Sequence, residues 1–451
     1  MSHIDDLSIS YRLGRRYVIW SFRQFYSRII VLGKEHLPAD GAAIYGGNHL
    51  NALMDALVLL SLPAYTMPVV FVARADIFAN AFFVRALRFL KILPAYRIRN
   101  GYGNLGKNAE VFDVCADILL RKHCLGIMPE GNQTLERKMH TLAKGMFRIA
   151  FSAQERMPAG ETVKLVPVGI DMGSLFHAGH HLILNIGKPI PVSHYMEQYR
   201  ENPATALNVL RADYLQALRD VTVDYRTDNY YSTFEYVSEM ADTVLAQQMF
   251  HNSTTLSRFF ARQELATRLT ALEERTPEAL NALQTLVEQH KQAAAEARLP
   301  AWLFKKPPIT YLKLLMHGLG MILTSGVFIS GCVLSGLPFL CSRQIVKALK
   351  LKEKKFVSSI YYAVSALITF PFFYLLNITL FLTLMPCAWW WVFPFICVQY
   401  PLGRAAFFWY HWAQKMALQV RYRRFSRKNP VLMDTIVQLQ KAMLSNVLRE
   451  V

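Results

Sequence analysis

The sequence predicts an α/β domain over residues 36–202, followed by a helical segment and then by C-terminal transmembrane or re-entrant helices. Three observations predict this order. Short apolar runs alternate with helical patterns up to residue 192. A charge-mixed helical pattern fills residues 203–304. Two stretches of 29 and 48 residues without Asp, Glu, Lys or Arg lie within residues 305–403.

The composition restricts the class of protein. The chain has 451 residues, is 53% hydrophobic and carries a formal net charge of +18. These values exclude a disordered chain, a collagen-like repeat and a disulfide scaffold. The basic surplus indicates an anionic partner, and the apolar character favours an acidic membrane surface over nucleic acid. None of the six cysteines forms a CxxC pair, so we expect reduced thiols in the core or the membrane.

The N-terminal segment, residues 1–35, is expected to contain a membrane-interfacial helix. From Tyr17 to Leu32, aromatic and aliphatic residues are interleaved with Arg23 and Arg28, a pattern that also fits a core helix. The first ten residues are polar and include two aspartates, unlike a cleaved signal peptide. We therefore expect the domain that follows to lie on the cytoplasmic side.

Within residues 36–202, short apolar runs mark the expected strands. The runs are AAIYGG (42–47), PVVFVA (68–73), CLGIMP (124–129), VKLVPVGI (163–170) and LILNIG (182–187).

The first run continues into GGNHLNALMDALVLL, which places His49 before an apolar helix that contains Asp55. Asn51 is a candidate N-cap for this helix. Six helical residues turn through about 600°, so the two side chains cannot share a face of one continuous helix. With His49 in the preceding loop, however, the imidazole can fold back over the first turn. Asp55 can then accept a hydrogen bond from one ring nitrogen and leave the other as a base. The alternative interpretation is that His49 and Asp55 form a pair with a purely structural role.

Three further blocks follow expected strands. Arg97 follows FLKILPAY, Glu130 and Gly131 follow CLGIMP, and Pro167 lies in VKLVPVGI. Residues at the carboxyl ends of strands in an α/β domain tend to line one crevice. We therefore expect a base, its orienting acid, a guanidinium and a carboxylate to converge there. A His–Asp pair without a nearby Ser or Cys nucleophile suits deprotonation of a substrate hydroxyl.

The order NHxxxxxD, LPAYR, PEG and VPV resembles the PlsC-like glycerolipid (phosphate) acyltransferases, over about residues 45–192. The resemblance implies a mixed sheet flanked by helices. It implies that His49 is the general base, oriented by Asp55. The remaining residues are assigned to substrate binding. Arg97, Glu130 and Gly131 are assigned to the phosphorylated acceptor, Asn48 to substrate without a more specific role, and Pro167 to a fourth motif that suits acyl-chain packing.

The chain departs from most of this family in one respect, because five residues rather than four separate His49 from Asp55. This HxNxxxD pattern resembles fungal glycerol-3-phosphate/dihydroxyacetone-phosphate acyltransferases. The resemblance implies acyl-CoA or acyl-ACP as donor, glycerol-3-phosphate or 1-acylglycerol-3-phosphate (lysophosphatidate) as acceptor, and no further cofactor. Two alternatives stay open. One is an acceptor such as another lysophospholipid or an amino-acid-derived lipid, and the other is a catalytically silent membrane lipid-binding or scaffold protein.

A histidine cluster after the VPV block, His177, His180 and His181, has the pattern HxxHH. No acid or cysteine stands near it at ligand spacing, so we expect a loop role and no metal site.

In the helical segment, Thr276-Pro277-Glu278 has the order of an N-cap, a first-turn proline and a first-turn acid. It predicts that one helix ends near Arg275 and another begins at Pro277.

The second uncharged stretch, residues 356–403, is long enough to cross a membrane twice, at about 1.5 Å per residue and about 30 Å per crossing. Basic residues are concentrated in 343–355 and 404–428, and the positive-inside rule places both on the cytoplasmic side. The sequence therefore predicts a hairpin that turns near Asn377 or Pro386. The tail, residues 404–451, is expected to be helical and to bind anionic lipids through RYRRFSRK (421–428).

Overall fold

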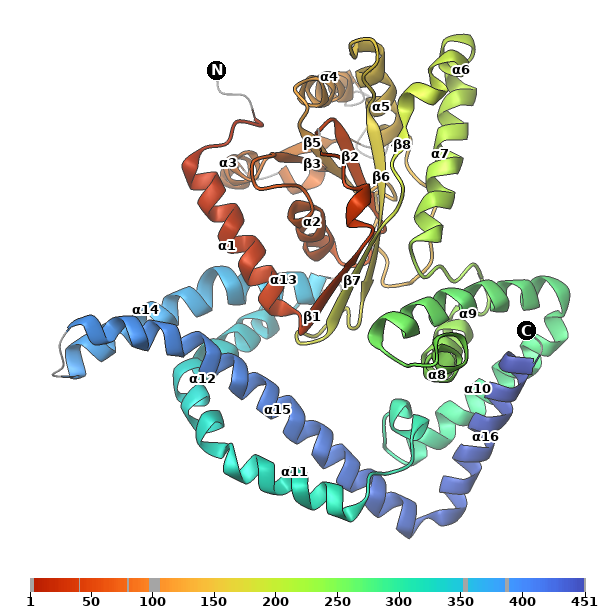
Figure 1. Ribbon diagram of the computed structural model, residues 1–451, viewed down its shortest axis with the longest axis vertical. Helices are drawn as coiled ribbons and strands as arrows, with labels where there is room; N and C mark the ends of the chain where they lie inside the picture. The colour runs from red at the N-terminus through yellow and green to blue at the C-terminus, as the bar shows by residue number, and fades with distance from the viewer. Residues whose placement is uncertain are drawn as a thin grey trace. The chain divides into compact units, whose positions relative to one another are not determined.

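The computed structural model describes residues 4–39, 41–78, 81–96, 106–351, 356–385 and 389–449 (Figure 1). The chain divides into two compact units. The first is Met1–Asp224 together with Glu353–Ser359, and the second is Tyr225–Lys352 with Ile360–Val451. The first unit thus extends past residue 202, the expected end of the α/β domain.

The first unit is built on a mixed sheet with the order β1-β7-β6-β2-β5-β3-β4, and β8 pairs with β6. β7 and β8 run antiparallel to β6, and the other pairs are parallel. The five apolar runs are confirmed as β2, β3, β5, β6 and β7. The strands are β1 (Arg28–Leu32), β2 (Ala43–Gly47), β3 (Val69–Arg74), β4 (Ile92–Ala95), β5 (Cys124–Ile127), β6 (Lys164–Met172), β7 (His181–Ile186) and β8 (Ile190–Pro191).

Helices cover both faces of this sheet, with α1 and α2 on one side and α5 and α7 on the other (Figure 1). α4, α5 and α7 share one hydrophobic core with the central strands. In that core, burial raises the pKa of the Cys115 thiol to about 12, as expected for an inert core cysteine. The helices are α1 (Ile9–Phe25), α2 (Ala52–Ser61), α3 (Ala81–Phe89), α4 (Gly106–Leu120), α5 (Gly145–Arg156), α6 (Met196–Glu201) and α7 (Pro203–Asp220), with short 3-10 turns at Lys34–His36, Ala75–Phe78 and Val192–Tyr195.

The helix expected from Tyr17 to Leu32 is confirmed as far as Phe25 and is wrong beyond it. Helix α1 ends at Phe25, and the next residues form strand β1, which pairs in parallel with β7. The β-branched run Ile29-Ile30-Val31 explains the change, because such side chains favour a strand.

The strand register brings the sequence motifs to one edge of the sheet. Gly46 pairs with Ile127 on one side and with Pro167 on the other, so β2, β5 and β6 carry their motifs side by side. The buried Tyr214 hydroxyl on α7 fastens this edge, lying 2.9 Å from the Gly46 carbonyl oxygen and 3.1 Å from that of Val166. A Cβ at Gly46 would overlap the hydroxyl, which explains the glycine.

All regular secondary structure among the described residues of the second unit is helical. The predicted boundary at Thr276 is confirmed, since α9 ends at Arg275 and α10 begins at Pro277. The helices are α8 (Tyr231–Phe250), α9 (Thr255–Arg275), α10 (Pro277–Glu296), α11 (Tyr311–Leu323), α12 (Ser325–Ala348), α13 (Val357–Val364), α14 (Phe370–Leu384), α15 (Val392–Lys428) and α16 (Pro430–Arg449), with a π-helical turn at Ser365–Thr369 and 3-10 turns at Ala301–Lys305 and Trp389–Trp391. The first three residues of α13 belong to the first unit and the rest to the second.

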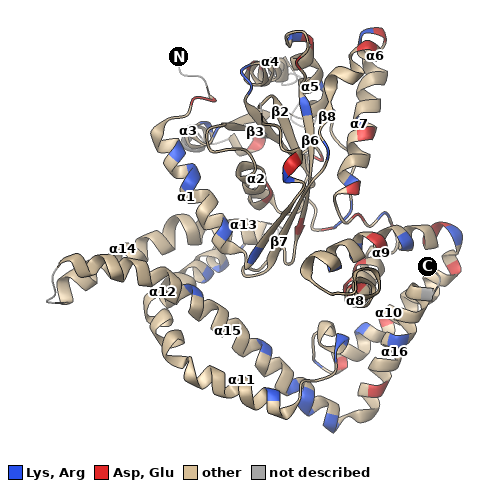
Figure 2. Ribbon diagram, in the orientation of Figure 1, with Lys and Arg blue, Asp and Glu red and all other residues tan. Residues whose placement is uncertain are grey.

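Two helical stretches are long and apolar enough to cross a membrane, Ser325–Ala348 and Val357–Leu384. Helix α14 contains neither basic nor acidic residues (Figure 2). Asn377 lies inside α14, so the turn predicted there is wrong. The other predicted turn residue, Pro386, lies outside the described residues.

Candidate functional site

The candidate functional site lies in the first unit and begins where strand β2 ends. Gly47 is the last strand residue, and Asn48 to Asn51 form a loop before helix α2 begins at Ala52. His49 therefore precedes the helix and Asp55 lies in its first turn, as the spacing predicts.

The His49 imidazole folds back over this first turn. Its Nδ1 lies 2.9 Å from Oδ2 of Asp55, with the histidine side chain 17% exposed and the aspartate fully buried. Because Nδ1 faces the carboxylate, Nε2 is the ring nitrogen left to take a proton from a substrate. No serine or cysteine in the described part of the chain hydrogen-bonds to His49, so the geometry provides a general base rather than a covalent nucleophile.

The Asp55 carboxylate is fixed through one oxygen. Oδ2 accepts both the His49 bond and the backbone N–H of Asn51, at 2.6 Å. Oδ1 is buried and has no hydrogen-bond partner among the described residues. A buried carboxylate compensated in this way stabilises the positive charge that appears on the imidazole when it takes a proton.

The predicted N-cap at Asn51 is right in position, but its side chain makes no cap hydrogen bond. The Asn51 amide instead donates to the Leu175 carbonyl at 2.8 Å. The next residue, Ala52, has φ +28°, in the left-handed region that residues with a side chain rarely adopt. The backbone thus turns sharply between the base and its acid.

Glu130 lies beside this loop and holds its backbone. Its Oε1 accepts the backbone N–H of His49 at 3.0 Å. Burial, with the nearby charges of Asp55 and Asp224, raises the pKa of Glu130 to about 8, against the lowering effect of backbone bonds from His49 and His140. A carboxyl that is largely protonated at neutral pH does not repel an anion.

The other predicted site residues have structural contacts. The Asn48 side chain exchanges two hydrogen bonds with the backbone of Ile170, at 3.0 and 2.7 Å, and is buried. It fastens the loop to β6, and a substrate contact by Asn48 stays a prediction. Gly131 has φ +67° and closes a turn onto the Met128 carbonyl. Pro167 is buried within β6.

Arg97 lies outside the described residues, so its place relative to His49 stays a prediction. Another arginine, Arg137, follows the PEG block and lies by the end of β6. It donates to Asp171 Oδ1 at 3.0 Å and to the Met172 carbonyl at 2.8 Å. The sequence motifs gave no signal for this residue.

Two serines that the sequence analysis did not select contact the same loop. Ser358 and Ser359 both donate to the Asn51 side-chain oxygen, at 2.9 and 3.1 Å. Both belong to the first unit, although more than 300 residues separate them from Asn51. In the sequence they stand between a basic run and an apolar stretch, a setting that gives no catalytic signal.

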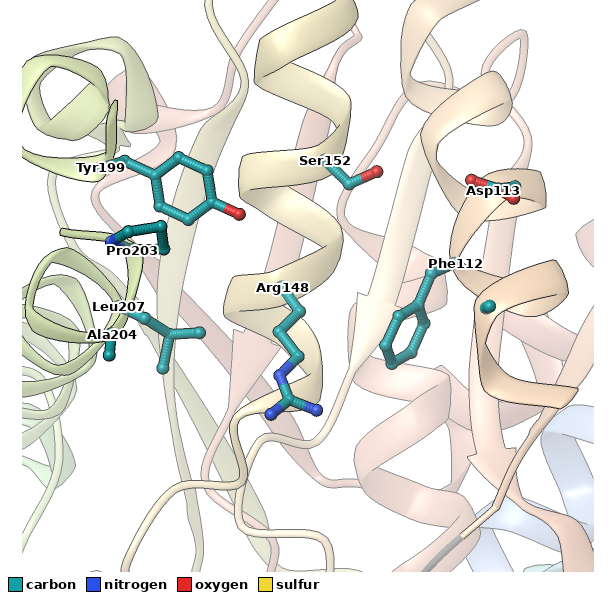
Figure 3. Close-up of a pocket in the computed structure, with 9 residues that line it drawn as sticks. Phe112, Asp113, Arg148, Ser152, Tyr199, Pro203, Ala204 and Leu207 are labelled. Atoms are coloured by element: carbon teal, nitrogen blue, oxygen red, sulfur yellow. The ribbon is translucent and has the colours of Figure 1, made fainter. Parts of the chain in front are cut away.

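A surface pocket of about 450 Å³ lies elsewhere in this unit, between α4, α5 and the α6–α7 region (Figure 3). Arg148 and Tyr199 are among its lining residues, and it shares none with the His49–Asp55 pair. Among the described residues, no three His, Cys, Asp or Glu side chains are grouped as a metal site requires.

Comparison with known proteins gives a family match and a structural match for the first unit. The family model described as Acyltransferase matches residues 28–171. No curated protein matches the chain significantly. One similar solved structure is the 1-acyl-sn-glycerophosphate (LPA) acyltransferase PlsC from Thermotoga maritima. It is 19% identical, with a TM-score of 0.34 over 47% of this chain and 78% of that chain. A likeness this slight says nothing of the substrate of this chain. The His49–Asp55 pair lies within the residues that match this acyltransferase model.

Proposed function

We propose that the protein is a membrane-bound O-acyltransferase. It transfers a fatty acyl chain from acyl-CoA or acyl-ACP to glycerol-3-phosphate or 1-acylglycerol-3-phosphate, in the synthesis of phosphatidic acid. The observation that carries this proposal is the 2.9 Å contact between His49 Nδ1 and Asp55 inside an acyltransferase-family domain.

The chemistry follows from the free ring nitrogen. His49 Nε2 takes the proton of the acceptor hydroxyl while its oxygen attacks the thioester carbonyl carbon. Collapse of the tetrahedral intermediate breaks the C–S bond, and the imidazolium returns its proton to the thiolate. Asp55 keeps the imidazole in the tautomer with the proton on Nδ1 and stabilises the imidazolium. The transfer needs no cofactor beyond the acyl donor.

Exposed apolar surface supports the membrane part of the proposal. On α1, Ile9, Leu13 and Trp20 are exposed, and Arg12 and Arg16 stand among them. An apolar face interspersed with cations suits the interface of an anionic membrane. The two long apolar helical stretches of the second unit support membrane association in the same way.

The decisive experiment compares membranes that contain the wild type, His49→Ala or His194→Ala. Each receives labelled acyl-CoA or acyl-ACP together with glycerol-3-phosphate or lysophosphatidate. We expect labelled lysophosphatidate or phosphatidate, with a loss of about 10²–10⁴-fold for His49→Ala, the usual contribution of a general base. His194 is exposed and distant in sequence from the motifs, so His194→Ala serves as the control. Equal activity of wild type and His49→Ala would contradict the proposal.

The acceptor is tested at Arg97. If this guanidinium binds the acceptor phosphate, Arg97→Ala raises the KM for glycerol-3-phosphate or lysophosphatidate strongly and changes the KM for the acyl donor little. An unchanged acceptor KM would indicate an acceptor recognised without its phosphate, such as an amino-acid-derived lipid. Product formed only from another lysophospholipid would identify that acceptor class.

A further inference from the structure

Helix α2 begins without help from its own N-cap side chain. The Asn51 amide is directed to Leu175, so it does not cap the first turn. The first-turn N–H of Leu53 is bound instead by the Ser359 hydroxyl, at 3.2 Å. A residue 306 positions away thus supplies the cap of the helix that carries Asp55.

The same serine and its neighbour hold the Asn51 side chain. Ser358 and Ser359 donate to Oδ1 of Asn51, and all three residues are at most 4% exposed. Buried polar groups that lose a partner cost free energy, so the amide has one favourable position while both hydroxyls are present.

The position of Asn51 matters because its backbone N–H is one of the two groups bound to Asp55 Oδ2. Movement of the Asn51 backbone therefore moves the carboxylate oxygen that orients His49. The adjacent Ala52 is held at φ +28°. A conformation of this kind persists only where surrounding contacts fix it, so it relaxes when they are removed.

We propose that Ser358 and Ser359 are positioning residues for the His49–Asp55 pair, and that they act through Asn51. This inference rests on the proposed function for its kinetic test. It assigns a role in the acyl transfer to two serines at the start of helix α13 that belong to the first unit.

The kinetic test uses the full-length enzyme with Ser358→Ala, Ser359→Ala and the double substitution. We expect the double variant to lose about 10- to 100-fold in kcat, the scale of an ångström-sized misplacement, with little change in either KM. The matched control is Ser365→Ala, which removes a buried hydroxyl that donates to the Tyr362 carbonyl of its own helix. Should the double variant fail to fold, Ser358→Ala alone still removes one of the two bonds to the Asn51 side chain.

Combined substitutions distinguish a positioning role of Ser358 and Ser359 from a merely structural one. If the serines act through Asn51 and Asp55, the double serine substitution adds little to the loss already caused by Asn51→Ala or by Asp55→Asn. Equal fold-losses in the wild-type and Asp55→Asn backgrounds, or unchanged kcat per folded enzyme, would overturn the inference.

A second readout does not depend on turnover. Diethylpyrocarbonate acylates a free imidazole nitrogen, and mass spectrometry gives the modification rate at His49. We expect the double serine variant and Asp55→Asn to lower this rate alike, and Ser365→Ala to leave it unchanged. If these modification rates are found but the wild type transfers no acyl group, the proposed function is contradicted and the positioning role still stands. Normal modification with normal kcat would contradict the positioning role alone.

Discussion

At the scale of single residues, Glu130 makes the folded state sensitive to pH. Its pKa is about 8 in the fold, against 4.5 for an ordinary glutamate. Between these values the folded protein holds a proton that the unfolded chain has released, so stability falls as the pH rises from about 4.5 to about 8. Below about pH 4.5 the folded and unfolded states both hold the proton, so Glu130 causes no loss of stability there.

Glu130→Gln removes this titration while the amide oxygen can still accept the His49 N–H. We expect the apparent melting temperature of the wild type to fall more steeply between about pH 5 and pH 8 than that of the variant. Glu136→Gln, an exposed glutamate of the same loop, is the control and should follow the wild type. Parallel curves for Glu130→Gln and wild type would show that Glu130 does not titrate in this range.

At the scale of elements, α12 and α15 pack through small residues within the second unit. A Cβ at Gly331 of α12 would overlap the Leu402 carbonyl oxygen of α15, and one at Gly403 would overlap the Ser335 hydroxyl. Small residues of this kind let two helix backbones approach closely, as is common for helices in membranes.

Gly331→Leu should therefore separate the two helices and destabilise the second unit by about 1–3 kcal/mol, the usual cost of overpacking. Gly336→Leu places the same side chain on the same helix where a Cβ meets no atom within 4 Å, so it should be tolerated. Thermal denaturation of the two variants in detergent makes the comparison. Equal melting temperatures would show that this close approach does not matter for stability.

At the scale of the whole chain, the apolar stretch of residues 356–403 carries the features of a membrane hairpin. Exposed Trp389–Trp391 lies between α14 and α15, and aromatic residues at such a position suit a membrane interface. The basic end of α15, with Arg423, Arg424 and Arg427, suits the cytoplasmic side. We expect α14 and α15 to form the hairpin, with the tryptophans at the opposite interface.

An epitope tag inserted after Trp390 should then resist protease added from the cytoplasmic side of sealed vesicles. A tag at Val451 should be cleaved in the same vesicles. Cleavage of both tags would show that the hairpin does not cross the membrane.

The sequence by itself determined strands β2, β3, β5, β6 and β7, the helix boundary at Thr276 and the hydrogen bond between His49 and Asp55. Each depends on neighbours along the chain, through apolar runs, capping residues or a six-residue spacing. Tertiary structure alone decided that β1 joins the sheet, that Glu130 binds the His49 backbone, and that Ser359 caps α2. These contacts join residues from 81 to 306 positions apart, and local patterns carry no information about which distant groups meet. The charge of Glu130 was also decided by tertiary structure. Its carboxyl is largely protonated only because the fold buries it away from water.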